Sequence, residues 1–164
     1  MQPLTATDLV AAPTPTTMVA AEVLRGTSRL LHDLGHVVLP EFGLACGRRA
    51  DVLALGPDGC FVIVEIKSCR QDFLTDRKWP DYLGYADRFY FAVAPGFPEA
   101  ILPEDEGLIL ADRFEGALVR PAQVRPLAAA RRKALLLSFA RTAASRLRYL
   151  TDSGPELGAI PFTL

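Results

Sequence analysis

The sequence predicts an α/β domain with a mixed central sheet flanked by helices, and three observations support this fold class. A β-hairpin pattern spans residues 49–67, where two runs of apolar and β-branched residues flank a Gly-Pro-Asp-Gly turn. A further run, residues 88–94, is apolar on both faces and follows a segment long enough for a helical crossover, so it predicts a buried parallel strand. Residues 127–150 have the periodicity of a long helix.

The length and composition of the chain indicate one domain. The chain has 164 residues, and half of them are hydrophobic, which fits a globular protein with a sizeable core. We expect this domain to cover residues 16–150. Residues 1–15 are rich in Ala, Thr and Pro and show no periodicity, so they predict a mobile N-terminal tail, and residues 151–164 predict a C-terminal tail.

The first expected element is a helix. It should begin after Thr16 or Thr17, which are good N-cap residues, and end at Gly35 as a C-cap. Gly26 in its interior either weakens the helix or marks the close approach of another backbone. A strand at residues 37–44 follows, and its internal proline is typical of an edge strand.

The turn of the hairpin predicts the pairing of its two strands. Pro57 presets φ for the second position of a type I turn, and Asp58 suits the third position. Gly59 can adopt the left-handed conformation that closes a three-residue loop with a bulge. We therefore expect Gly56 to pair with Cys60, and this pairing fixes the register of the whole hairpin.

This register brings two carboxylates and one amine together. Asp51 should lie opposite Glu65, and Lys67 should share the face of Glu65 because side chains alternate along a strand. Like charges opposed in a sheet destabilise it, but Asp and Glu oxygens are the ligands that Mg²⁺ prefers. A metal-bound water beside a lysine is an arrangement that can hydrolyse a substrate. The alternative is a surface charge cluster in which Lys67 pairs with both acids.

The segment that follows, residues 68–87, is rich in charged and aromatic residues. It predicts two short helices or one broken helix, with Pro80 in a first turn. One interpretation is a solvated face held by a few aromatic anchors. The other is a wall over the carboxylates, in which Lys78 and Tyr82 can contact phosphate. The buried strand at residues 88–94 then continues the sheet.

Two short strands, residues 107–111 and 117–120, precede the long helix at residues 127–150. The periodicity predicts a core-facing stripe on this helix, made of Leu136, Phe139, Ala140, Ala143, Leu147 and Leu150. Arg141 and Arg148 lie on the opposite face. Residues 116–150 contain no Asp or Glu and eight basic residues. We therefore expect Arg141 and Arg148 to contact the phosphates of a nucleic acid, with ordinary solvation of the helix as the alternative.

The pattern Asp51-(x13)-Glu65-x-Lys67 on a hairpin resembles the PD-(D/E)xK nuclease superfamily, with Ala50 in place of the leading proline. The longer run EIKSCRQDFLTDRKWPDYLGYADRFYFAV, residues 65–93, is similar to the MmcB-related DNA repair proteins, a small branch of that superfamily. The resemblance covers about residues 19–150. It implies a restriction-endonuclease-like core of order αβββαβ.

The resemblance also implies a function. It implies a DNA endonuclease that acts in DNA repair and hydrolyses phosphodiester bonds with Mg²⁺ or Mn²⁺. Asp51 and Glu65 would hold the metal with the Ile66 carbonyl as a further ligand, and Lys67 would act on the attacking water. Many relatives add a glutamate, for which Glu22 or Glu41 are the candidates. Two alternatives stay open: a non-catalytic nucleic-acid-binding module of the same fold, and an unrelated interaction protein.

Other features of the sequence bound the cofactors and partners. The net charge is −1, so overall charge alone does not predict a nucleic-acid-binding protein. The three cysteines show neither CxxC nor Cys/His spacing, which argues against a disulfide framework and a zinc site. No apolar run approaches the ~18 residues of a transmembrane helix. We expect a cytoplasmic protein without a membrane contact whose partner is DNA, and we leave a homodimer open.

Overall fold

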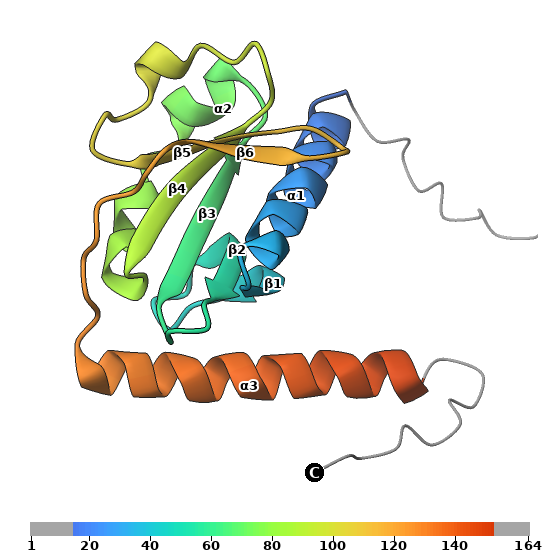
Figure 1. Cartoon of the computed structure of the whole chain (residues 1–164), viewed down its shortest axis with the longest axis vertical. Coiled ribbons are helices and arrows are strands. Elements are labelled where there is room, and N and C mark those ends of the chain that lie inside the picture. Colours follow the sequence, from blue (N-terminus) through green and yellow to red (C-terminus); the bar gives the residue numbers. More distant parts are fainter. Residues whose placement is uncertain (1–14, 153–164) are drawn as a thin grey trace, which may run out of the picture.

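The computed structural model describes residues 15–152. A six-stranded sheet lies between helices (Figure 1). The elements are α1 (Pro15–Asp33), β1 (Val37–Gly43), β2 (Arg49–Leu55), β3 (Phe61–Lys67), α2 (Arg70–Thr75), the 3₁₀ helix η1 (Trp79–Tyr85), β4 (Arg88–Val93), the 3₁₀ helix η2 (Glu99–Ile101), β5 (Gly107–Ala111), β6 (Gly116–Arg120) and α3 (Ala129–Asp152). Apart from Pro15, Thr151 and Asp152, which lie in helices, the expected tails fall outside the described residues.

The sheet is mixed, as predicted. Its strands follow the order β1-β2-β3-β4-β5-β6. The pairs β1–β2, β2–β3 and β5–β6 are antiparallel, whereas β3–β4 and β4–β5 are parallel. β1 is an edge strand, as its proline predicts, and the segment between β3 and β4 forms two short helices rather than one. The α/β fold class and the long C-terminal helix are therefore confirmed.

The hairpin has the predicted turn and register. The N–H of Gly56 donates to the carbonyl of Cys60 at 2.9 Å, and Gly59 has a φ of 80°, in the left-handed region. Val52 then pairs with Val64. The turn residues therefore set the pairing that the sequence predicts.

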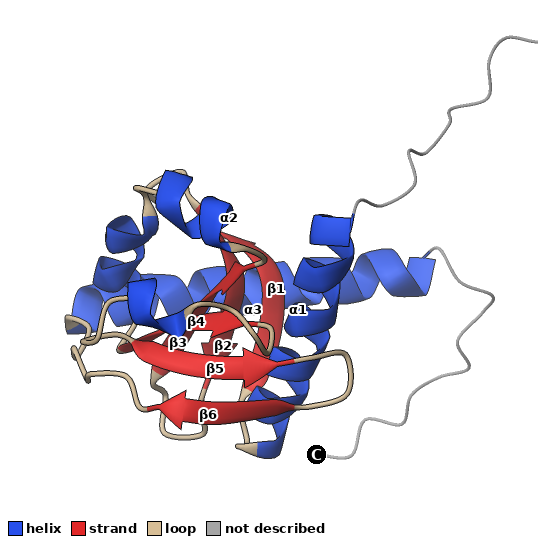
Figure 2. Ribbon diagram, turned by 90° about the horizontal axis from the view of Figure 1, so that it is seen from above, coloured by secondary structure: helices blue, strands red, loops and turns tan. Residues whose placement is uncertain are grey.

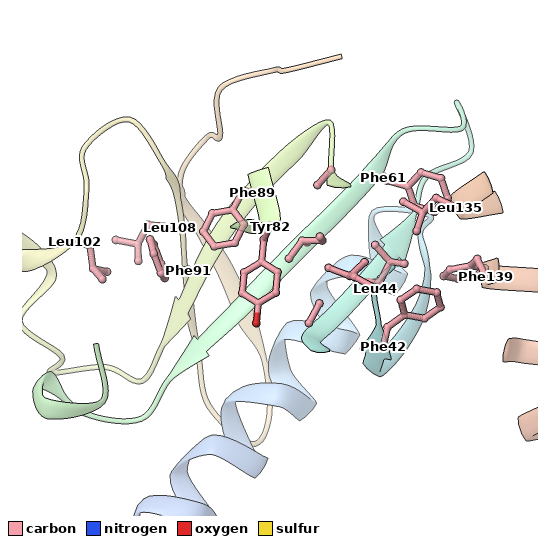
Figure 3. Close-up of a cluster of buried hydrophobic side chains, with 14 of the residues drawn as sticks. Phe42, Leu44, Phe61, Tyr82, Phe89, Phe91, Leu102, Leu108, Leu135 and Phe139 are labelled. Carbon is pink, nitrogen blue, oxygen red and sulfur yellow. The ribbon is translucent and has the colours of Figure 1, made fainter. Parts of the chain in front are cut away.

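Helices cover both faces of the sheet. α1 packs through Val23 and Leu31 on the face that includes Val62 and Val64 of β3. The other face is covered by α2, η1 and α3 (Figure 3). All seven residues of β3 are buried, including its two charged residues. This double coverage explains why β3 reads as an almost continuous apolar run. Within residues 15–152 no helix is long and apolar enough to cross a membrane.

Gly26 marks a close backbone approach, one of its two predicted meanings. The loop between β5 and β6 reaches α1 at this position (Figure 2). A Cβ atom at Gly26 would overlap the carbonyl oxygens of Asp112 and Glu115. Because these atoms belong to backbone, they cannot move aside as a flexible side chain could.

We predict that Gly26→Ala destabilises the protein by about 1–3 kcal/mol through this overlap, although alanine is the better helix former. Gly43→Ala is the matched control, since an added Cβ there meets nothing within 4 Å and the backbone is not in the left-handed region. The control should stay within about 0.5 kcal/mol of wild type. Urea unfolding monitored by circular dichroism measures both, and equal stabilities of the two variants would contradict the prediction.

The predicted core stripe of α3 is correct at Phe139 but wrong for its leucines, because the helix is rotated about its axis. Leu135 and Phe139 are its buried residues, whereas Leu136, Leu147 and Leu150 are 38%, 58% and 67% exposed. Phe139 packs against two aromatic rings of the sheet, with centroid distances of 6.1 and 6.2 Å (Figure 3).

Polar contacts set this rotation. Near the start of α3, the guanidinium of Arg132 donates to both carboxylate oxygens of Asp87 at 2.9 and 2.6 Å. Near its end, Arg146 donates to the carbonyl oxygens of Pro40 and Glu41 at 2.6 and 2.8 Å. Both arginines lie on the side of Phe139, so the helix cannot turn its leucine-rich side inward without losing them. Periodicity alone does not contain this information.

A candidate metal site at the end of the hairpin

Asp51 lies where the two strands of the hairpin separate. The last residue pair of the β2–β3 ladder at this end is Val52–Val64. Beyond it, the Oδ2 atom of Asp51 accepts the N–H of Ile66 at 2.8 Å. A side-chain carboxylate therefore replaces a backbone partner at the position opposite Glu65, and it points into the gap between the strands.

Lys67 is buried between two carboxylates. Its Nζ donates to Oε1 of Glu65 at 3.2 Å and to Oδ2 of Asp76 at 2.7 Å. The Lys67 and Glu65 side chains are only 4% and 9% exposed. Water therefore screens these charges poorly, and the ion pairs compensate part of the cost of burying them.

Asp51, Glu65 and Lys67 line one pocket of about 420 Å³. Its walls are Thr17, Ala20, Ala21 and Leu24 of α1, together with Glu41, Asp51, Glu65, Ile66, Lys67 and Asp72. Of the two glutamates considered as a further metal ligand, the structure brings Glu41 to this pocket. Glu22 is not among the lining residues, because residues 17, 20, 21 and 24 form the side of α1 that faces the pocket. Glu41 also binds Arg49, with Oε2 2.6 Å from Nε, and has a left-handed φ of 51°.

Burial and mutual repulsion shift the pKa values of the carboxylates. Burial, followed by the charge of Asp51, raises the pKa of Glu65 to about 7. Burial also raises the pKa of Asp51, against the hydrogen bond from Ile66. For Lys67 burial alone would lower the pKa, but the carboxylates of Glu65 and Asp76 outweigh it and raise the pKa. Near neutral pH, Glu65 is therefore protonated in only part of the molecules, and a cation can displace that proton.

A divalent cation fits the donor set. The Oε2 atom of Glu65 is buried and has no hydrogen-bond partner among the described residues. With all groups ionised, the carboxylates of Asp51, Glu65 and Asp76 and the amine of Lys67 leave two uncompensated negative charges. Residues 15–152 contain no cluster of three or more Asp, Glu, His or Cys side chains arranged to hold a metal. The fit is therefore to an ion held by two carboxylates plus water, the manner in which Mg²⁺ commonly binds.

The comparisons with known proteins give the family. The model of the MmcB-like family, described as DNA repair protein MmcB-like, matches residues 11–154. The chain belongs to this family. A solved structure, the SPO1766 protein of unknown function from Silicibacter pomeroyi, is 42% identical and has a TM-score of 0.79. The similarity covers 88% of this chain and 94% of that chain. No curated protein matches the sequence.

Two acids of this MmcB-like protein were missed by the sequence analysis. Asp76 pairs with Lys67, and Asp72 accepts the N–H and the hydroxyl of Ser68 at 2.9 and 3.0 Å. Both belong to the α2 segment and fix it to the end of β3. The available signal was the presence of two acids in the short segment that follows Lys67, although Asp76 lies just beyond the end of α2.

Of the four residues predicted to contact nucleic acid, three are exposed and one is buried in this MmcB-like protein. Lys78 is exposed at the start of η1, close in sequence to Asp76. Tyr82 is buried, and its hydroxyl donates to the carbonyl of Arg49 at 3.0 Å, so it packs the core instead of facing a phosphate. Arg141 and Arg148 are exposed on α3.

Proposed function

We propose that this protein is a metal-dependent nuclease that hydrolyses phosphodiester bonds of DNA during DNA repair. The observation on which the proposal rests is the buried, unpartnered oxygen of Glu65 beside Asp51 and Lys67. The description of the MmcB-like family supports DNA repair as the setting. The arrangement of Asp51, Glu65 and Lys67 is consistent with the PD-(D/E)xK superfamily.

Each residue of the pocket has a role in this proposal. Asp51 and Glu65 would hold Mg²⁺ or Mn²⁺ together with water, and the Ile66 carbonyl is a further oxygen ligand. Glu41 lines the pocket but stays paired with Arg49. When bound, the ion supplies a Lewis acid and lowers the pKa of a coordinated water. Lys67 has three N–H bonds, of which Glu65 and Asp76 take two. The third would donate to the attacking water or to a phosphate oxygen. Its positive charge offsets the charge that develops on the phosphate.

DNA is expected to approach over the open side of this pocket. Exposed basic side chains on the elements around the pocket include Arg49 on β2 and Arg70, Arg77 and Lys78 on the segment around α2. They offset the negative pocket and offer phosphate contacts, which dominate DNA affinity and make it dependent on salt. We assign Lys78 and these arginines to the DNA path.

The metal can be tested without measuring catalysis. Mg²⁺ or Mn²⁺ at about 100 times its Kd should stabilise the wild-type protein by about 2.7 kcal/mol, seen as a rise in Tm. Glu65→Gln removes a charged ligand at nearly constant shape and should abolish the rise. Glu22→Gln is the matched control, because Glu22 does not line the pocket, and it should keep the wild-type shift. An equal rise in all three proteins would contradict the site.

The same shift should depend on pH, because the ion must displace the proton of Glu65. The pKa of Glu65, about 7, predicts the full metal-induced rise in Tm at pH 8 and only a small rise at pH 5.5.

In the metal-free protein, the raised pKa of Glu65 means that the folded state keeps its proton to a higher pH than the unfolded chain. The folding stability that this proton contributes is fully present below the ordinary pKa of 4.5 and is lost as the pH rises through about 7. Glu65→Gln should abolish that loss, so a variant no more stable than wild type at pH 8 would argue against the raised pKa.

A non-catalytic DNA-binding module of the same fold is the second candidate. Two features of Lys67 favour this candidate. Its side chain is buried and its Nζ is engaged in ion pairs, and both restrict the access of Nζ to a substrate. The two candidates differ in one measurement, since only the nuclease cleaves DNA when metal is added.

A further inference from the structure

The side of α3 that the fold leaves uncovered is apolar along most of the helix. Six exposed residues follow one another at helical spacing: Leu136, Leu137, Ala140, Ala144, Leu147 and Leu150. We call them the α3 stripe. Leu137, Leu147 and Leu150 are each more than half exposed. From Leu136 to Leu150 the stripe extends over about 21 Å at 1.5 Å per residue. α3 runs along the lower side of the domain in Figure 1.

Such spacing is typical of a helix that packs against another helix. Residues separated by three and four positions align on one side, as in the seams of helical bundles and coiled coils. Within the described residues, however, α3 buries only Leu135 and Phe139, which lie on a neighbouring side. A contiguous exposed apolar surface of this kind marks an interaction site on a soluble protein.

The charges beside the stripe are all positive. Arg141 and Arg148 each follow a stripe residue, Leu137 and Ala144, by one turn, so they border it. Lys133 lies at its start. Among residues 15–152 none of these three cations forms an ion pair, whereas Arg132 and Arg146 are engaged by Asp87 and by carbonyl groups. The last residue of α3, Asp152, is its sole acid.

We propose that the α3 stripe docks an amphipathic helix of a partner protein, with aliphatic residues on one side and Asp or Glu along the flank that meets Arg141 and Arg148. The partner supplies the acids that α3 lacks, and burial of the leucines supplies the affinity. A second copy of this chain is less suitable, because it would bring arginines against arginines. DNA suits the arginines but leaves the leucines exposed to water. The proposal is independent of the nuclease activity.

Two synthetic 28-residue helical peptides serve as probes. Both have leucines at positions three and four apart, and they differ only in carrying Glu or Lys along the flanks. Binding to the full chain is measured by fluorescence anisotropy, and the mass of each complex by light scattering. We expect a one-to-one complex, with the Glu peptide bound at least about tenfold more tightly than the Lys peptide at low salt.

Variants of the chain separate the apolar contribution from the charge. Leu147→Ser should lower the affinity for the Glu peptide by about tenfold or more, since burial of one leucine contributes that much binding free energy. Leu34→Ser, at an exposed leucine of the α1–β1 turn, is the control and should change nothing. Arg141→Glu with Arg148→Glu should reverse the preference, so that the Lys peptide binds better. Arg25→Glu with Arg113→Glu makes the same change in net charge elsewhere and should leave the preference intact.

Four results would overturn the proposal. The first is equal binding of the two peptides, or no binding. The second is a wild-type dimer that Leu147→Ser converts to a monomer, which would make the stripe a self-interface. The third is peptide binding seen only after residues 153–164 are deleted, which would mean that the chain covers its own stripe. The fourth is a DNA affinity whose log–log salt slope falls by about 1–2 in the Arg141→Glu, Arg148→Glu variant while peptide binding is unchanged, which would assign these arginines to DNA.

Discussion

Glu65→Gln is expected to abolish metal-dependent DNA cleavage, with a rate at least about a thousandfold below wild type. Loss of a metal ligand removes several kcal/mol of transition-state stabilisation, and each 1.36 kcal/mol is about a factor of ten. The fold should survive, because glutamine has nearly the same shape and can still accept the hydrogen bond from Lys67. Asp76 continues to compensate the charge of Lys67 at 2.7 Å.

The measurement uses labelled DNA that is duplex, single-stranded, flapped or mismatched, with Mg²⁺ or Mn²⁺ added. Glu22→Gln, outside the pocket, should cleave at the wild-type rate. Cleavage by Glu65→Gln at that same rate would place the activity elsewhere or in a contaminant. If the wild-type protein binds these DNAs and cleaves none of them, the non-catalytic module becomes the better description.

Lys67→Ala is a less clean test of the same site. The substitution removes the cation that compensates the buried carboxylate of Glu65 and the partly buried carboxylate of Asp76. Breaking a buried ion pair from one side commonly costs about 3–5 kcal/mol. A loss of cleavage would then not separate chemistry from folding. Glu65→Gln removes a negative charge from a cluster that has two in excess, so it relieves repulsion instead of creating it.

Asp87→Ala is expected to destabilise the fold by about 3–5 kcal/mol at a position far from the candidate metal site. Asp87 is 1% exposed, and its carboxylate accepts the N–H of Phe61 at 2.7 Å and of Leu127 at 2.9 Å as well as both guanidinium bonds from Arg132. These hydrogen bonds lower its pKa although burial alone would raise it. Alanine would remove the acceptor of the Phe61 and Leu127 N–H groups and of Nη2 of Arg132, whereas Nη1 of Arg132 keeps the carbonyl of Gly59 at 2.6 Å. The start of α3 would therefore be held less firmly.

Urea unfolding measures the free energy of unfolding that Asp87→Ala loses. A loss of about 3–5 kcal/mol is a large part of the roughly 5–15 kcal/mol that keeps a typical domain folded. Asp81→Ala is the matched control. Asp81 also pairs with an arginine, Arg48, at 2.9 Å, but the side chains are 51% and 37% exposed. Exposed pairs contribute about 0–1 kcal/mol, so the control should unfold close to wild type. Similar losses in both variants would show that burial does not set the cost.

Arg132→Met and Asp87→Leu combined would separate the charge from the packing. If the unpaired charge causes most of the loss, the double variant should be more stable than either single variant. A double variant at least as unstable as Asp87→Ala would assign the loss to the backbone donors of Phe61 and Leu127.

Several features could be predicted from the sequence because local chemistry determines them. The Pro57-Asp58-Gly59 loop fixes the register, since a one-residue slip would move every side chain of the hairpin to the other face. Register then brings Asp51, Glu65 and Lys67 to one place. Gly26 could be singled out in the helix interior, but its two meanings, a weakened helix or a close backbone approach, stayed open.

Other features were decided by tertiary structure alone. The rotation of α3 depends on Asp87 and on two carbonyl groups of β1, which are distant in sequence, and periodicity could not rank the side of Phe139 above the side of Leu136 and Leu147. Lys78 and Tyr82 lie four residues apart in a segment without clear periodicity, so only packing shows that one is exposed and the other is buried.

The sequence by itself thus determined the hairpin, its register and the meeting of two carboxylates with a lysine, because each follows from turn geometry and strand alternation over fewer than about 20 residues. The tertiary structure decided that Asp76 is the second partner of Lys67, that Glu41 rather than Glu22 reaches the pocket, and that the leucines of α3 stay exposed. These outcomes depend on contacts between elements, whose energies depend on burial and on partners that no local pattern specifies.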